Sequence, residues 1–112
     1  MKDLQPLMAL LSHAESERDA ALGQRQRAQQ AVDAARTQSE QLVAYRRDYE
    51  QRWSERFAQP GQVDVLRCYH GFAERLTQAI EQQSRVTAQA ERQLERTTAA
   101  LQQLELRVAS VL

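Results

Sequence analysis

The stretch Gln59-Pro60-Gly61-Gln62 constrains the fold of this chain more than any other feature. Proline cannot continue a helix and restricts the residue before it, and glycine accepts the positive φ that often closes a helix C-terminus. The long segments on either side are rich in the helix formers Ala, Gln, Glu, Arg and Leu. The sequence therefore predicts two helices, over about residues 3–58 and 64–111, joined by a turn at about residues 59–63. Asp3 and Asp64 are the expected N-cap residues.

Apolar and small residues recur at alternating intervals of four and three along both segments, which is the heptad pattern of a coiled coil. We call these positions the seam. In the first segment they are Leu4, Leu7, Leu11, Ala14, Arg18, Ala21, Arg25, Ala28, Val32, Ala35, Ser39, Leu42, Arg46, Tyr49 and Trp53. In the second they are Leu66, Tyr69, Ala73, Leu76, Ile80, Gln83, Thr87, Ala90, Leu94, Thr97, Leu101, Leu104, Val108 and Val111. The predicted fold class is all-α, a long antiparallel two-helix coiled-coil hairpin formed by residues 1–112 as a single unit.

Small and charged residues weaken the first seam. Alanines at seven-residue intervals allow close approach of the two backbones but bury little area, so we expect modest stability there. They are Ala14, Ala21, Ala28 and Ala35. The three seam arginines, Arg18, Arg25 and Arg46, have two interpretations: their aliphatic stems cover the seam while the guanidinium groups reach water, or they bind an acidic partner.

Aromatic residues gather next to the predicted turn, where Tyr45, Tyr49, Trp53 and Phe57 recur every four residues. Such a row indicates a local core that closes the hairpin together with Tyr69, although an aromatic ligand site is the alternative. A turn centred between Pro60 and Gly61 also predicts the pairing of the helices, with Leu42 near Ile80.

Charge and composition exclude several functional classes. Fifteen basic and fifteen acidic residues are mixed along both segments and give a net charge of zero, which argues against nucleic-acid binding. Cys68 is the single cysteine and has no intrachain partner for a disulfide. Apolar runs are too short for a membrane span, and the first residues lack a signal-peptide pattern. We therefore expect a soluble cytoplasmic protein.

No pattern in the sequence indicates catalysis. His13 and His70 have no neighbours at metal-ligand spacing, and only Arg67 lies near Cys68 to activate its thiol. A phosphate-binding glycine loop is absent from the sequence. The chain is expected to be no enzyme and to use no cofactor or metal.

A second apolar row accompanies the seam of the second helix. It contains Val65, Tyr69, Phe72, Leu76, Ala79 and Gln83. One partner helix covers one stripe, so Phe72 and Ala79 are expected to be partly exposed beside buried Tyr69 and Leu76. This strip would suit a partner protein, unless the aromatic residues of the first helix cover it.

Part of the chain resembles the FliJ family of coiled-coil proteins from the bacterial flagellar type III export apparatus. The resemblance covers roughly residues 40–85. It rests on Leu42-Val43-Ala44-Tyr45-Arg46-Arg47-Asp48-Tyr49, then on Tyr69-His70-Gly71-Phe72 and Leu76-Thr77-Gln78-Ala79-Ile80-Glu81-Gln82-Gln83.

The resemblance implies a hairpin similar to the central stalk of rotary ATPases. Its open end, built from the two termini, would enter the hexameric ring of the export ATPase FliI. The corresponding residues here are Leu4, Leu7, Leu11, Leu104 and Val108. The family's strip for binding the export gate protein FlhA maps onto Phe72, Leu76, Ala79 and Gln83, the last at a position where a histidine can occur. The protein would thus lie at the inner face of the cell membrane through the gate, with no membrane span. Two alternatives are an injectisome stalk protein of the YscO type and a generic structural coiled-coil adaptor.

Overall fold

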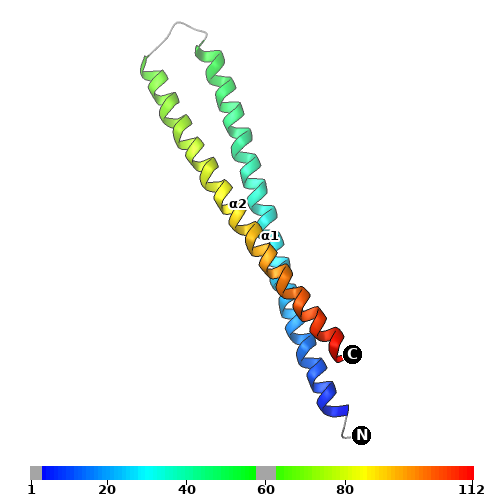
Figure 1. Ribbon diagram of the computed structural model, residues 1–112. Coiled ribbons are helices and arrows are strands. Elements are labelled where there is room, and N and C mark those ends of the chain that lie inside the picture. Colours follow the sequence, from blue (N-terminus) through cyan, green and yellow to red (C-terminus); the bar gives the residue numbers. More distant parts are fainter. Residues whose placement is uncertain (1–3, 58–62) are drawn as a thin grey trace. The chain divides into compact units, whose positions relative to one another are not determined.

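A computed structural model describes residues 4–57 and 63–112, apart from the side chains of Phe57, Val63 and Asp64. It contains helix α1 (Leu4–Phe57) and helix α2 (Val63–Val111) (Figure 1). The expected turn at Gln59-Pro60-Gly61-Gln62 and the expected N-cap Asp3 lie outside the described residues. Helix α2 begins one residue before Asp64, the other expected N-cap.

The predicted fold class, an all-α antiparallel two-helix coiled-coil hairpin, is confirmed. The chain divides into two compact units, and each contains a segment of both helices. Unit 1 comprises Met1–Asp33 and Gln89–Leu112, and unit 2 comprises Ala34–Ala88. The helices therefore pack against one another within each unit.

In unit 1 the core follows the predicted seam. Val32 is completely buried, and its buried neighbours along the seam of α1 are alanines. The small side chains on α1 are compatible with close approach of α2, whose buried seam residues Leu101 and Val108 are larger. The buried residues of unit 1 are Ala14, Ala21, Ala28, Val32, Thr97, Leu101 and Val108.

In unit 2 the core is thinner. Ala35 and Leu76 are buried, whereas Leu42 and Ile80 are half-buried. Leu66 occupies a seam position but is 41% exposed, so the seam of α2 is not covered at its first position.

The seam arginines lie half-buried, as their aliphatic stems predict. The Arg25 guanidinium donates from Nε to Thr98 Oγ1 over 3.2 Å, which joins the two helices of unit 1. Arg18 pairs with its neighbour Asp19 at 3.0 Å. The arginines thus cover the seam while their charged groups remain at its margin.

Cross-helix contacts define the pairing of the helices. Tyr49 contacts Phe72 in unit 2, and Arg25 contacts Thr98 in unit 1. Both pairs lie at nearly equal distances in sequence from residues 60 and 61. This is the pairing expected for a turn centred between Pro60 and Gly61.

Candidate partner-binding surfaces

Aromatic side chains of both helices form one cluster in unit 2, which we call the aromatic cluster: Tyr45, Tyr49, Trp53, Tyr69 and Phe72. Tyr49 lies at its centre, with ring centroids 4.5 Å from Phe72, 5.6 Å from Tyr69 and 5.8 Å from Trp53. The four-residue spacing on α1 places its three rings on one face, toward α2. Tyr45, Tyr49, Trp53 and Tyr69, which the sequence assigns to packing near the turn, are therefore in ring contact. Phe57 has no described side chain.

The aromatic cluster is not closed to solvent. Tyr45 remains 51% exposed although it stacks on Tyr49 and meets the edge of Phe72. Tyr69 is half-buried, whereas the sequence pattern predicted a buried ring. Two helices cannot enclose five large rings from all sides, so part of each remains accessible.

The strip of α2 borders this cluster. Phe72 and Ala79 are half-buried, as expected, and Leu76 is 7% exposed. Tyr45 and Tyr49 cover part of the Phe72 ring, so the alternative in which aromatic residues of the first helix pack over the strip applies to one of its residues. Gln83 is also half-buried, and its side-chain amide donates to the carbonyl oxygen of Ala35 on α1 over 3.2 Å.

Apolar residues are exposed where α1 begins in unit 1. Leu4 and Leu7 are 55% and 51% exposed, and Met8 and Leu10 are more exposed still. In unit 1, α1 continues past the last residue of α2, so neither described helix faces these side chains (Figure 1). Of the other residues assigned to the open end, Leu11 and Leu104 are half-buried and Val108 is buried. The freely accessible part is therefore on α1.

An open depression of about 500 Å³ runs along the same part of α1. Its lining combines apolar, hydroxyl and acidic side chains: Met8, Leu11, Ser12, Glu15, Ser16 and Asp19. Residues of a single helix form it, so it lacks the convergent side chains from several elements that a catalytic site requires.

The comparison with protein families decides the identity of the chain. It matches the model of the flagellar FliJ protein over residues 1–111. The chain belongs to the FliJ family. No curated protein and no solved structure shows a significant match to it. Membership confirms the resemblance seen in residues 40–85 and extends it to both helices, and it assigns the chain to flagellar protein export, in a family of structural, non-catalytic components.

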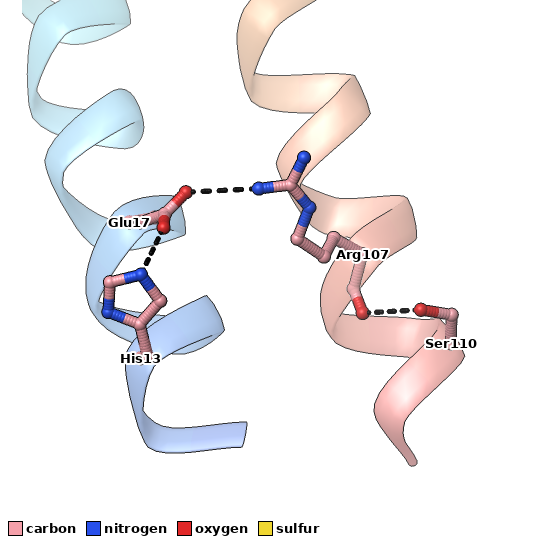
Figure 2. A network of polar contacts seen from close by, with 4 residues as sticks. All are labelled: His13, Glu17, Arg107 and Ser110. Carbon is pink, nitrogen blue, oxygen red and sulfur yellow. Dashed lines mark hydrogen bonds and ion pairs between the residues drawn. The ribbon is translucent and has the colours of Figure 1, made fainter. Parts of the chain in front are cut away.

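This FliJ-family chain also carries a polar network that the sequence reasoning missed. Glu17 lies between two basic side chains: its Oε1 is 2.5 Å from His13 Nε2 and its Oε2 is 3.3 Å from Arg107 Nη1 of α2 (Figure 2). Ser110 donates to the Arg107 carbonyl oxygen within α2. The four-residue spacing of His13 and Glu17 in the sequence is enough to predict their contact on one face of a helix. The Arg107 partner depends on the pairing of the helices and has no local signal.

The described residues give no indication of a metal site or of a membrane-spanning helix. No three side chains of the types His, Cys, Asp or Glu come together there as a metal ion would require. Neither described helix contains a stretch apolar and long enough to cross a membrane. Cys68 is exposed on α2.

Proposed function

We propose that this protein is a non-catalytic stalk of the flagellar type III export apparatus, which contacts the export gate through one part of the hairpin and enters the export ATPase ring through the other. The observation that carries the proposal is the match to the FliJ family along both helices, combined with accessible apolar residues in both units. The match favours the flagellar system over an injectisome stalk and over a generic adaptor.

The gate protein FlhA is the proposed partner of the strip in unit 2. Phe72, Leu76, Ala79 and Gln83 form this site, but they contribute differently. Phe72 and Ala79 present accessible surface to a partner. Leu76 supports them from the buried side, and the Gln83 amide is already engaged by α1.

A charged residue at Ala79 tests this site, because a carboxylate in an apolar interface is left without a partner. Ala79→Asp is expected to weaken binding to the cytoplasmic domain of FlhA at least tenfold in a titration. The matched control is Gln78→Asp, since Gln78 is exposed and lies about 100° around the helix from its neighbour Ala79. Equal loss of affinity in both variants, or in neither, would contradict the assignment of the strip.

The ring of the export ATPase FliI is the proposed partner of the open end. Leu4 and Leu7 supply the accessible apolar side chains there, beside the half-buried Leu11. Leu104 and Val108 contribute the less exposed α2 side of the same end. A protein that makes both proposed contacts works in the cytoplasm, peripheral to the inner face of the cell membrane.

ATP hydrolysis by the cognate export ATPase measures the second contact. The chain is expected to raise the rate or promote hexamer formation, and Leu7→Asp is expected to lose most of this effect. Leu22→Asp is the control, because Leu22 is an exposed leucine of the same helix outside the open end. A chain without any influence on the ATPase would exclude the stalk mechanism and leave the structural adaptor.

A further inference from the structure

A polar layer interrupts the seam of unit 2. Ser39 of α1 and Gln83 and Thr87 of α2 occupy three seam positions, and all three are half-buried beside Ala35, which is 5% exposed. We call Ser39, Gln83 and Thr87 the polar layer. Within unit 2, Leu42, Leu76 and Ile80 lie between it and the aromatic cluster in the sequence of the two helices.

Three of its four hydrogen bonds cross between the helices, two of them to the backbone of α1. Gln83 Nε2 donates to the Ala35 carbonyl oxygen over 3.2 Å. Thr87 Oγ1 lies 2.9 Å from the Gln83 carbonyl oxygen, 3.4 Å from that of Ala35 and 3.3 Å from Ser39 Oγ. A hydroxyl has one proton, so when Thr87 donates to either carbonyl it accepts from Ser39. Every member of the layer then has a partner.

Ala35 allows these contacts because its methyl group leaves the carbonyl accessible. A helical carbonyl oxygen accepts one bond within its own helix and retains a second lone pair. The Gln83 amide donates to this second lone pair over 3.2 Å. The contact therefore depends on a particular level of α1 facing Gln83.

The alanine-rich seam alone does not fix that level. Because Ala14, Ala21, Ala28 and Ala35 recur every seven residues, a slide of α2 by one heptad toward the N-terminus of α1 would bring Ala28 to the level of Ala35. The polar layer does not repeat in this way. After a slide in this direction Thr87 would face Val32 in place of Ser39 and lose that hydrogen bond. After the opposite slide Thr87 would face Arg46 and Gln83 would face Leu42 in place of Ala35. An amide left without a partner beside a leucine in the seam is unfavourable.

We propose that the polar layer of Ser39, Gln83 and Thr87 determines the register of the two helices, and that Gln83 acts as a positioning residue inside the hairpin. Together with the aromatic cluster, the layer selects one heptad alignment of the two helices. It thereby sets which α1 aromatic residues meet Phe72. The proposal does not depend on the export function.

Thr97 shows that a buried polar residue of the seam does not always have this role. It is 8% exposed, but its hydroxyl bonds to Gln93 O and Leu94 O within α2. Both acceptors belong to α2 itself, so these bonds form whichever residues of α1 face Thr97. Thr97→Val is therefore the matched control for Thr87→Val.

Distance measurements between two spin labels report the register. Labels are attached to cysteines that replace Gln51 on α1 and Ser84 on α2, both exposed, in a chain that carries Cys68→Ser. These positions lie at different levels of the hairpin. A slide of one heptad shifts α2 by about 10 Å along α1 and changes their separation directly.

The labelled chain with an unchanged polar layer is expected to give one narrow distance distribution and to be a monomer in light scattering. Gln83→Leu with Thr87→Val is expected to give a second distribution, displaced by up to about 10 Å, or a dimer, with its helix content retained. Thr97→Val and Thr87→Ser keep the single distribution. Gln83→Met, which keeps the length of the side chain and removes the donor, tests the same point if the double variant does not fold. A single unshifted distribution in a monomer for every folded variant would overturn the proposal.

Discussion

The contribution of the buried seam of unit 1 to the free energy of unfolding can be measured by replacing valine with alanine at two positions. Val32 is completely buried in unit 1, whereas Val86 is 45% exposed in unit 2. Val32→Ala removes about two buried CH2 equivalents, or about 1.6 kcal/mol, and leaves a small cavity that adds to the loss. The higher helix propensity of alanine returns roughly 0.5 kcal/mol. The net destabilisation is therefore about 1.5 to 2.5 kcal/mol.

At Val86 the same substitution is expected to change the free energy of unfolding much less. Only about half of the transfer free energy is lost, and the gain in helix propensity offsets most of it, so the net change stays within roughly 0.5 kcal/mol. Urea unfolding followed by circular dichroism measures both. With a denaturant slope of about 2 kcal/mol per molar, Val32→Ala lowers the midpoint by about 1 M and Val86→Ala leaves it nearly unchanged. Equal midpoints for the two variants would refute the assignment of the core to the alanine-rich seam.

Three further predictions concern the same unfolding experiment. Gly71→Ala is expected to stabilise the chain by up to about 1 kcal/mol, because a Cβ added there meets no atom within 4 Å, and a lower midpoint would contradict this. Leu76→Ala is expected to cost about 2 to 5 kcal/mol, since the side chain is buried, and a change below about 1 kcal/mol would show that the strip is open at this position. Glu17→Gln weakens the ion pair with Arg107 but is expected to change stability by less than about 1 kcal/mol, because both side chains reach solvent; a larger loss would mean that the network is more than a surface pair.

Periodicity predicted most of the fold because it depends on local spacing alone. The four-three alternation identified the inward face of both helices, and from Leu11 onward each seam residue of α1 is buried or half-buried. The pattern fails where a seam position has no facing residue. Leu4 and Leu7 are exposed for this reason, since periodicity defines a face and carries no information on whether a second helix is present at that level.

The candidate surfaces were less predictable, because they depend on which atoms meet across the helices. The spacing of residues in the sequence was enough to identify the strip. It did not show that Tyr45 and Tyr49 cover part of Phe72. The polar contacts of Glu17 with Arg107 likewise follow from the level at which the helices pair. A sequence pattern gives each helix its faces, and the three-dimensional pairing decides the partners.

Gln83 illustrates why binding data on the strip need a structural control. Its position in the row of α2 suggests a contact with the gate, but its amide bonds to Ala35 inside the hairpin. If register depends on that bond, a Gln83 variant with weakened gate binding would act by moving Phe72 relative to Tyr49. A direct contact and a register effect differ in one respect: only the second alters the distance between labels on α1 and α2 in the absence of a partner. Measuring that distance before any affinity therefore separates the two roles of a residue that faces both a helix and a candidate interface.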